Sequence, residues 1–297
     1  MKQREFLRAR LAARQVIWSA GCYDALSAKL IEAAGFETVL TSGFGVSASL
    51  LGQPDVELYT MTENLAVARN VVAAVDIPVV ADCDTGYGNA VNVMRTVREF
   101  EQAGVAAVIL EDQVVPKRCP AIANRVEVIP MAEGVAKIRA AVEARRDPDL
   151  VIVARTDADS EQESIARARA YIEAGADMVQ PISKTFKTAA GLRNLRDSVS
   201  VPLSLQVLGW LEKDLSADDL RDIAGMATFP LVALMTVADA MMKNLAALAA
   251  AKNTAGLPVP VMDHKRFADL LGFAQISEIQ HRLLPEAPDF ATKNAAE

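Results

Sequence analysis

The sequence has few of the residues that build disulfide frameworks or histidine-based sites. Only three cysteines, Cys22, Cys83 and Cys119, occur among its 297 residues, and no Cys-x-x-Cys pair is present. An odd, scattered set argues against a disulfide framework and against a zinc site, and is typical of a reducing compartment. Both histidines, His264 and His281, lie near the carboxyl terminus. A Ser-His-Asp or His-metal mechanism therefore has little support.

Basic charge and long apolar runs are also scarce. The chain has 31 Lys and Arg residues against 38 Asp and Glu residues, a net charge of −7. This balance argues against nucleic acid or an anionic membrane as a partner. No stretch is predicted to cross a bilayer, and the charged amino terminus does not resemble a signal peptide. We therefore expect a cytoplasmic protein with no membrane partner.

What the sequence does contain is a repeated order of apolar run, polar or glycine-bearing turn, and amphipathic helix. The apolar runs predict eight strands, at residues 16–20, 38–42, 78–82, 107–111, 150–155, 178–182, 202–206 and, more weakly, 227–229. Between them, apolar residues at helical spacing predict helices, for example at 91–103 before Gly104 and at 165–174 before Gly175.

Several of these strands are almost continuous in Val, Ile and Leu, as expected when both faces of a parallel sheet are covered. Eight such repeats predict an α/β fold, a (β/α)₈ TIM-type barrel whose active site lies at the carboxyl ends of the strands. A doubly wound open sheet is the main alternative. The absence of G-x-G-x-x-G after the first strand, and the acidic residues that end several strands, favour the barrel.

The pattern changes near residue 250. We assign 1–250 to the barrel and 251–297 to a helical extension of the same domain, with a loop at 251–260 and a helix at 267–284. The extension either caps its own barrel or packs as an arm on a neighbouring subunit. The two tryptophans, Trp18 and Trp210, are expected to pack rather than to bind a ligand.

The strongest functional pattern is two acids at the end of the third strand, in Asp82-Cys83-Asp84-Thr85-Gly86-Tyr87-Gly88. Residues two apart in an extended chain point the same way, so Asp82 and Asp84 can converge on one point. Burying two carboxylates is costly unless a cation neutralises them. Helix capping or ion pairing would explain one of these acids well and two poorly.

The fourth strand also ends in two acidic residues, Glu111-Asp112, and Asp55 lies in a loop before the third strand. Acids at the ends of two neighbouring strands make an oxygen-rich site of the kind that Mg²⁺ prefers. Alone, Glu111 would more often be a structural ion-pair member. Beside the aspartates, the balance favours a metal site with Mg²⁺ as the cofactor and Mn²⁺ as the alternative.

Other strand ends carry groups that could bind an anion or transfer a proton. Arg155 ends the fifth strand and could hold a carboxylate, or could pair with a structural acid. The loop 116–125, long enough to act as a lid, contains Lys117-Arg118-Cys119; neighbouring cations would lower the pKa of the thiol, although a loop cysteine is more often incidental. Ser42-Gly43-Phe44-Gly45 could offer backbone amides, and Tyr23 a hydroxyl.

Taken together, these motifs resemble the isocitrate lyase and phosphoenolpyruvate mutase superfamily, especially its methylisocitrate-lyase-like branch. The resemblance extends from about residue 21 to residue 272. Its most specific segments are 23–28, 42–45, 82–88, 111–113, 116–119 and 154–157.

The resemblance implies a barrel whose eighth helix is exchanged between subunits, in a homotetramer built as a dimer of dimers. It implies a Mg²⁺ ion held by Asp84, directly or through water with Asp55, Asp82 and Glu111. A small 2-oxo or 2-hydroxy acid would bind this ion and be held by the amides of Ser42 and Gly43, by Phe44 and Gln206, and by Arg155. Cys119 would protonate a carbanion, with Lys117, Tyr23 and Arg155 as the further catalytic residues.

The sequence also departs from the lyase pattern. Pro120-Ala121 stands where lyases have Gly-His, Ile182 where they have Glu, and Gln206 where they have Asn. The metal half of the site is therefore kept and the rest of the pocket is changed, which argues against methylisocitrate itself.

Three functions follow, in order of preference. The first is a Mg²⁺-dependent carbon–carbon lyase acting on a malate- or isocitrate-like acid through an enolate or carbanion. The second is an oxaloacetate-type decarboxylase or hydrolase, or a phosphonomutase. The third is a barrel that binds a metabolite without catalysis.

Overall fold

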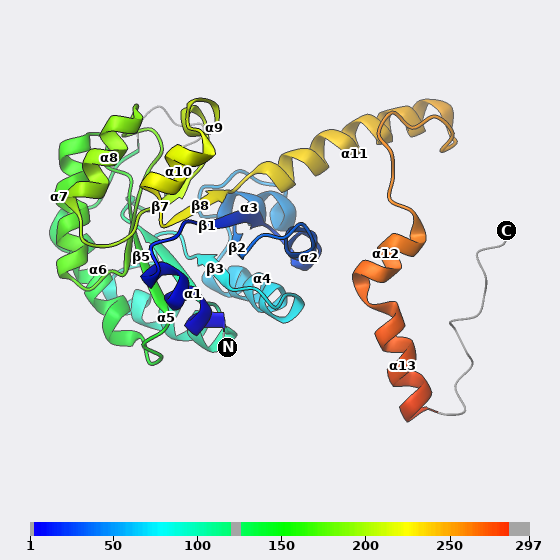
Figure 1. Cartoon of the computed structure of the whole chain (residues 1–297), viewed down its shortest axis with the longest axis horizontal. Coiled ribbons are helices and arrows are strands. Elements are labelled where there is room, and N and C mark those ends of the chain that lie inside the picture. The colour runs from blue at the N-terminus through cyan, green and yellow to red at the C-terminus, as the bar shows by residue number, and fades with distance from the viewer. Residues whose placement is uncertain (1–2, 120–125, 285–297) are drawn as a thin grey trace. The chain divides into compact units, whose positions relative to one another are not determined.

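Eight parallel strands form a nearly closed barrel in the computed structural model, which describes residues 3–119 and 126–284 (Figure 1). Their order is β6-β5-β4-β3-β2-β1-β8-β7, and an isolated parallel bridge between Val179 and Leu203 joins the two outermost strands. The predicted barrel is thus confirmed. The strands are β1 (Ile17–Cys22), β2 (Thr38–Thr41), β3 (Val79–Asp82), β4 (Ala107–Glu111), β5 (Val151–Thr156), β6 (Met178–Pro181), β7 (Ser204–Gln206) and β8 (Met226–Phe229).

Helices alternate with these strands and cover the outside of the sheet (Figure 1). In this part of the chain they are α1 (Gln3–Ala12), α2 (Ala25–Ala33), α3 (Gly43–Leu51), α4 (Met61–Ala74), α5 (Ala90–Ala103), α6 (Met131–Ala144), α7 (Glu161–Glu173), α8 (Ala189–Ser198), α9 (Trp210–Asp214) and α10 (Ala217–Ile223). Most begin at a residue whose side chain caps the first turn, such as Thr60 before α4 and Asn89 before α5.

The inside of the barrel is filled from its amino-terminal end. Leu7 and Leu11 of α1 pack with inward-facing residues from seven of the strands, which include Ile17, Leu40, Val80, Ile109, Val151, Val153, Met178 and Met226. All of these side chains are almost fully buried. The barrel is therefore a packed core rather than a channel. Only the layer of side chains at the carboxyl ends of the strands remains for a site.

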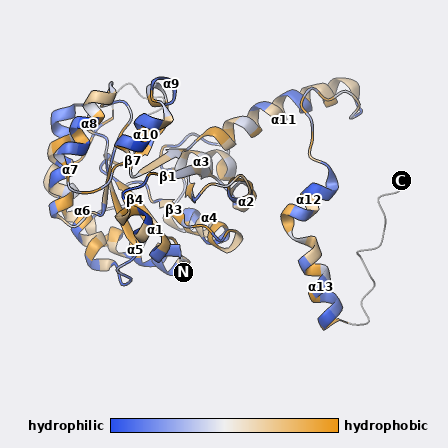
Figure 2. Cartoon of the chain, viewed as in Figure 1, coloured by the Kyte–Doolittle hydropathy of each residue, from blue (hydrophilic) through white to orange (hydrophobic). Residues whose placement is uncertain are grey.

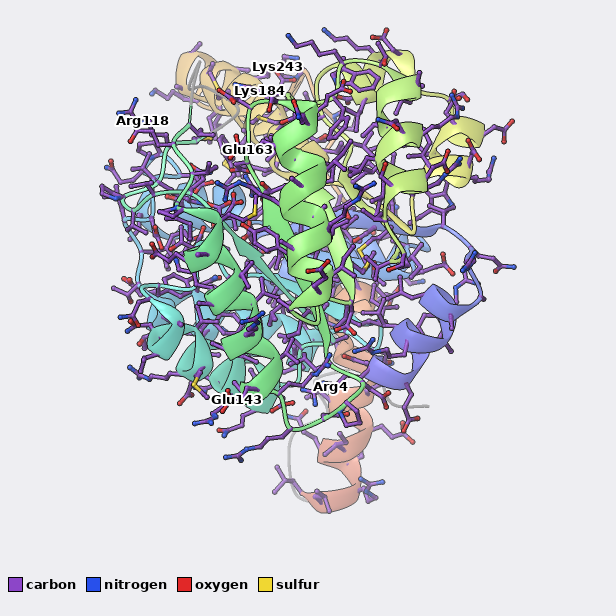
Figure 3. The ribbon with its side chains drawn as sticks, turned by 90° about the vertical axis from the view of Figure 1, so that its left-hand side faces the viewer. Arg4, Arg118, Glu143, Glu163, Lys184 and Lys243 are labelled. Carbon is purple, nitrogen blue, oxygen red and sulfur yellow. The ribbon has the colours of Figure 1, made fainter. Side chains whose placement is uncertain are left out.

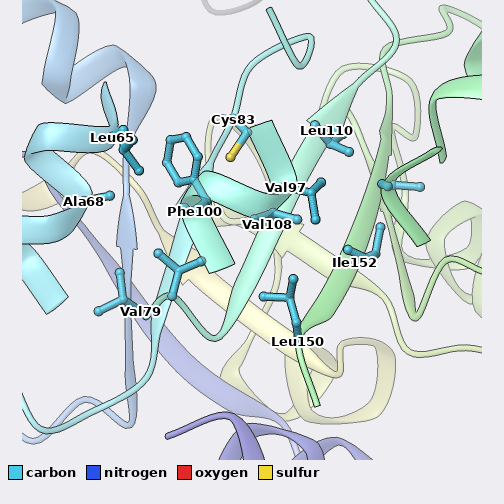
Figure 4. Close-up of a cluster of buried hydrophobic side chains, with 14 of the residues drawn as sticks. Leu65, Ala68, Val79, Cys83, Val97, Phe100, Val108, Leu110, Leu150 and Ile152 are labelled. Atoms are coloured by element: carbon cyan, nitrogen blue, oxygen red, sulfur yellow. The ribbon is translucent and has the colours of Figure 1, made fainter. Parts of the chain in front are cut away.

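The alternate strand residues face outwards and pack against the helices. Figure 4 shows Val108 and Leu110 of β4 beside Val97 and Phe100 of α5, with Cys83 in the same cluster. The strands accordingly colour as hydrophobic while the covering helices are mixed (Figure 2). Because both faces of the sheet are buried, its strands lack the hydrophobic-polar alternation of a half-exposed sheet.

The strand parity decides which polar residues reach the site. Side chains two residues apart share a face, so Glu111 follows Ile109 inwards and Arg155 follows Val153. Loops after the strands lie at the same end. In Figure 3, Arg118 and Lys184, from loops after β4 and β6, lie at the end opposite Arg4 and Glu143. The carboxyl ends of the strands therefore carry the candidate site.

Most predicted boundaries agree with the structure within two residues, and the predicted helical segment at 267–284 is helical with one interruption. It is divided into α12 (His264–Leu271) and α13 (Phe273–Leu283). Gly272 between them adopts a left-handed backbone with φ of 77°, which ends α12. The preceding helix α11 (Val232–Ala251) continues to the first residue of the predicted loop, since alanine favours helix.

The chain falls into two compact units, residues 1–236 and 237–297. The boundary between the units falls within α11. The division into a barrel of 1–250 and an extension of 251–297 therefore stays a prediction. None of the residues of α11, α12 and α13 is buried. Large apolar side chains such as Met242 and Phe273 are exposed there, at 74% and 62%. Exposed apolar surface of this kind is typical of an interaction site.

The composition of α11 corrects one expectation from the sequence. The helix has 20 residues and is apolar enough to meet the length and composition of a membrane span. One such helix is weak support for a membrane protein, because core helices of other proteins meet the same criterion. The prediction that no stretch could span a bilayer is nevertheless wrong as stated.

Candidate active site

Four carboxylates from different elements surround one ammonium group at the carboxyl end of the barrel. The Nζ atom of Lys117 lies 3.0 Å from Oδ1 of Asp55 and 3.7 Å from Oε1 of Glu111, and forms a shorter ion pair with Asp84. Asp82 completes this group, which we call the acid cluster (Asp55, Asp82, Asp84 and Glu111). Lys117 is only 3% exposed. The structure therefore brings the predicted acidic residues together.

The electrostatics of the cluster follow from burial of like charges. Burial, followed by the neighbouring Asp84, raises the pKa of Asp82. Burial also raises the pKa of Glu111, although Arg155 and Lys117 oppose the shift. Burial alone would lower the pKa of Lys117, but the carboxylates around it outweigh that effect and raise it well above its usual value. Positive charge is therefore strongly favoured at this point.

Several buried oxygens of the cluster are neutralised by cations and not by regular hydrogen bonds. Among the described residues, Oδ1 of Asp55 and both Oε atoms of Glu111 accept no hydrogen bond, although each lies near Lys117 or Arg155. Hard oxygen donors of this kind suit Mg²⁺. Among the described residues, no three acidic, histidine or cysteine side chains are arranged to hold one ion directly. An ion bound by these oxygens would therefore need waters to complete its ligands.

Arg155 is fully engaged with protein carboxylates. Its Nε and Nη2 atoms donate to Asp157 at 2.8 and 2.9 Å, and its Nη1 atom lies 2.7 Å from Oε2 of Glu111. The structural pairing considered from the sequence is therefore observed. Arg155 also lines the cavity above the strands, so a role as carboxylate clamp stays a prediction. Asp157, which orients the guanidinium, was not singled out from the sequence.

The start of α3 brings backbone amides to the cluster. Ser42 caps this helix by accepting a hydrogen bond from the Gly45 amide, and the Gly43 amide points at Oδ2 of Asp82 from 3.4 Å. Helix amino termini favour anions. Ser42 and Phe44 both line the cavity. Tyr23 lies beside α3, where a Cβ on Gly45 would meet its Cβ at 2.8 Å, and its catalytic role stays a prediction.

A cavity of about 330 Å³ opens beside the cluster, a size suited to a small acid. Asp55, Asp82 and Arg155 form its polar wall, whereas its far wall is mainly apolar. The far wall consists of Ile182, Leu208, Trp210, Pro230 and Leu231, with Lys184 and Gln206 as polar neighbours.

Trp210 packs against a buried apolar cluster, as expected, and it also lines the cavity. Its Nε1 atom donates to the carbonyl of Ser183 at 2.9 Å, which joins the start of α9 to the loop after β6. Gln206 is held by its Nε2 atom, which donates to Oε1 of Gln180 at 3.2 Å, while its own Oε1 has no hydrogen-bond partner among residues 3–119 and 126–284. Gln180 is a cavity residue that sequence reasoning missed.

Cys119 lies in the segment after β4 and also lines the cavity. It is 8% exposed, so its thiol is screened from bulk water. The same segment turns Lys117 into the acid cluster, and the predicted lid at 116–125 stays a prediction. Pro120 and Ala121, two of the departures from the lyase pattern, lie outside the described residues.

Two further residues hold the acid cluster in place and were not identified from the sequence. The Nδ2 atom of Asn64 donates to the carbonyl of Asp82 and to the Tyr87 hydroxyl, both at 2.7 Å. Tyr87 donates in turn to Oδ2 of Asp84 at 3.0 Å. Asn64 lies on the buried face of α4, together with Ala68 and Val71. A polar residue among these apolar positions is the sequence signal from which Asn64 could have been identified.

Asp112 belongs to a different network. Its Oδ2 atom accepts hydrogen bonds from Tyr171 at 2.7 Å and Arg167 at 3.2 Å, and its Oδ1 atom accepts one from the Asp157 amide. Burial raises the pKa of this carboxyl. By strand parity it follows Leu110 outwards, so it joins β4 to β5 and α7 instead of entering the acid cluster.

Comparison with protein families matches residues 7–259 to the phosphoenolpyruvate phosphomutase family. This match covers most of the chain and confirms the resemblance drawn from the sequence motifs.

Individual relatives support the same assignment. The chain is 39% identical to 2,3-dimethylmalate lyase of Eubacterium barkeri, over 93% of this chain and 96% of that protein. It is 37% identical to an oxaloacetate decarboxylase of a Bradyrhizobium species, over 86% and 89% of the two chains. A solved structure of phosphonopyruvate hydrolase with oxalate and Mg²⁺ superimposes with a TM-score of 0.87 at 31% identity, over 96% of this chain and 100% of that one. All three are enzymes, so the non-catalytic alternative is set aside.

We predict that Asn64→Ala lowers the free energy of unfolding by about 1–3 kcal/mol, because it leaves a buried carbonyl and a buried hydroxyl without their donor. Urea denaturation measures this value. Asn70→Ala is the matched control, since Asn70 is exposed on the same helix α4, and it is expected to change stability by less than about 0.5 kcal/mol. Equal effects of the two substitutions would contradict the assigned role of Asn64.

Proposed function

Because the chain belongs to the isocitrate lyase and phosphoenolpyruvate mutase superfamily, we propose that it is a Mg²⁺-dependent carbon–carbon lyase. It cleaves a substituted malate-like 2-hydroxy acid to a 2-oxo acid and a second carboxylic acid. The observation that carries this proposal is the position of Cys119, which lines the same cavity as Asp55 and Asp82 of the acid cluster. A proton donor and a cation site on one small cavity are what this cleavage requires.

The carboxylates of Asp84, Asp82, Asp55 and Glu111 would hold the ion. When bound, Mg²⁺ supplies positive charge that offsets negative charge on the substrate as it develops. This assignment is supported by the buried oxygens of Asp55 and Glu111 that accept no hydrogen bond. Mn²⁺, which favours the same oxygen ligands, is the alternative ion.

In the proposed reaction, one group accepts a proton from the substrate and another donates a proton to it. The C-2 hydroxyl proton passes to a base at the acid cluster, the C2–C3 bond breaks, and its electron pair remains on C-3 as a carbanion. The thiol of Cys119 delivers a proton to that carbon. Lys117, with its raised pKa, remains a positive group beside the reacting oxygens, and Tyr23 stays a predicted donor. The Gly43 amide, Phe44 and Arg155 orient the 2-oxo acid, whereas the Ser42 amide already donates to the Cys22 carbonyl at 2.9 Å.

The far wall of the cavity supports an acid with alkyl groups and only two carboxylates. Ile182, Leu208 and Leu231 offer apolar surface there. Among the described residues that line the cavity, Arg155 and Lys184 are its cations, so a third carboxylate would be desolvated without a counter-charge. The similarity to 2,3-dimethylmalate lyase supports the same class of substrate.

A second candidate keeps the site and changes the reaction to decarboxylation or hydrolysis of an oxaloacetate-like acid, or phosphonate mutation. The similarities to an oxaloacetate decarboxylase and to phosphonopyruvate hydrolase favour it. A small 2-oxo acid would occupy the same cavity, and the carbanion left by loss of CO₂ would be protonated on the 2-oxo acid itself and not on a second acid. A cytoplasmic location stays a prediction for either reaction.

We propose further that α11 is exchanged between two copies of the chain, in a dimer or a dimer of dimers. Met235, Met242 and Leu245 form an exposed apolar stripe on this helix, at 48%, 74% and 55% exposure. The stripe lies at helical spacing and is long enough to be the covered face of an interface.

The lyase proposal predicts that Cys119→Ala lowers kcat on alkyl-substituted malates by about 100-fold or more, because a positioned general acid contributes at least that factor. A steady-state assay of 2-oxo acid release measures this. Cys22→Ala is the control, as it removes another buried thiol, one that is not among the residues lining the cavity. Near-complete turnover by Cys119→Ala would exclude the lyase, and turnover restricted to oxaloacetate would favour the second candidate.

The apolar wall predicts the effect of Ile182→Ala on substrate choice. We expect the ratio of kcat/KM for alkylated over unsubstituted malate to fall roughly tenfold, since a lost methylene contact is worth about that much. Unsubstituted malate is the internal control for general damage to the site. An unchanged ratio, or a wild-type preference for tricarboxylic acids, would show that Ile182 does not face the substituents.

The exchanged helix predicts that Met242→Glu reduces the oligomer to a smaller species in sedimentation velocity, because a charge cannot be buried at that face without a partner. Lys243→Gln changes the neighbouring, exposed position, which pairs with Asp239 at 2.6 Å, and should leave the mass unchanged. If Met242→Glu has the wild-type mass, the interface is elsewhere. Recovery of the wild type in the membrane fraction would instead assign the stripe to lipid.

A further inference from the structure

Two tyrosines approach the acid cluster, and only one has its hydroxyl occupied. The hydroxyl of Tyr87 accepts from Asn64 and donates to Asp84. The hydroxyl of Tyr59 is buried and has no hydrogen-bond partner among the described residues. The whole Tyr59 residue is 1% exposed, so bulk water cannot satisfy it. Buried hydroxyls are rarely left without a partner in folded proteins.

The place of the Tyr59 hydroxyl is fixed by the absence of a side chain at Gly43. A Cβ built on Gly43 would lie 2.7 Å from Oη of Tyr59, 3.1 Å from Oδ2 of Asp82 and 3.3 Å from Oδ1 of Asp84. The hydroxyl therefore reaches the acid cluster at the first residue of α3. Glycine at position 43 is what permits this approach.

The charges around Tyr59 decide which ligand its hydroxyl can meet. Burial, followed by Asp84, Tyr87, Asp82 and Asp55, raises the pKa of Tyr59, so its phenol stays protonated. A protonated phenol is a donor as well as an acceptor. The carboxylates nearby are acceptors, yet none is within hydrogen-bonding geometry of Oη. An oxygen atom held at the cluster by another group would complete the arrangement.

We propose that the Tyr59 hydroxyl donates a hydrogen bond to an oxygen of the ligand bound at the acid cluster, and so positions that ligand. This inference rests on the proposed function, because it assumes a Mg²⁺ ion and a small acid at that place. The oxygen belongs either to the bound acid or to a water of the ion. Both sources share one chemistry, an electron-rich oxygen beside Asp82 and Asp84.

Calorimetry on the full chain separates these sources. Mg²⁺ is titrated alone, and oxalate is then titrated at saturating Mg²⁺, into the wild type and into Tyr59→Phe. We expect oxalate to bind the variant roughly tenfold more weakly, the loss of one hydrogen bond to a charged acceptor. Unchanged Mg²⁺ affinity would assign the oxygen to the acid, and weaker Mg²⁺ binding would assign it to a water of the ion.

Tyr171→Phe is the matched control. Tyr171 is equally buried, at 1% exposure, but its hydroxyl has a partner in Asp112. We expect this variant to lose thermal stability and to keep its oxalate affinity. Tyr59→Phe should show the opposite, with no loss of stability in the absence of ligand, because no protein hydrogen bond is removed.

Two results would overturn the inference by itself. One is wild-type affinity of Tyr59→Phe for both Mg²⁺ and oxalate, when the wild type binds them. The other is a fall in ligand-free stability as large as that of Tyr171→Phe, which would show a partner for the hydroxyl within the protein. If the wild type binds neither Mg²⁺ nor oxalate, the proposed function is wrong, and the inference with it.

Discussion

The cost of gathering four carboxylates at one end of a barrel governs the arrangement of the site. Asp55, Asp82, Asp84 and Glu111 come from a loop and two neighbouring strands, and Lys117 lies among them. Like charges in a partly buried place repel one another and lose solvation, so the cluster is tolerated only with positive charge nearby. The segment after β4 is therefore tied to the cluster through Lys117, and it carries Cys119 to the cavity. The electrostatics that favour a metal ion also place the thiol.

The second constraint is strand parity, which sorts neighbouring acids into different roles. Glu111 and Asp112 are adjacent, but one follows Ile109 into the barrel and the other follows Leu110 towards α7. Glu111 meets Lys117 and Arg155, whereas Asp112 meets Tyr171 and Arg167. A change of register by one residue would exchange these environments. Of these two adjacent acidic residues, Glu111 therefore belongs to the candidate site and Asp112 to the scaffold, because their side chains point to opposite faces of the sheet.

The sequence predicts those features that are local or periodic. The eight strands and the acids at their ends follow from apolar runs and from a spacing of two residues, and the family motifs identified Lys117 and Cys119. Contacts between distant segments were not predictable in this way. Asn64 and Tyr59 reach the cluster from α4 and the loop before it, and Gln180 reaches Gln206 across the least paired edge of the barrel. Their roles depend on tertiary packing, which composition and spacing do not encode. The division at Gly272 was missed because apolar spacing outweighed one glycine in the pattern.

The plug formed by α1 has a consequence for the order of events in a reaction with two products. Leu7 and Leu11 fill the amino-terminal end of the barrel, so in the proposed reaction the substrate would enter and both products would leave at the carboxyl end. The 2-oxo acid held at the acid cluster would then leave after the second acid. Until it leaves, it would compete with the next substrate molecule. The packing of Leu7 and Leu11 at the amino-terminal end of the barrel would therefore contribute to product inhibition.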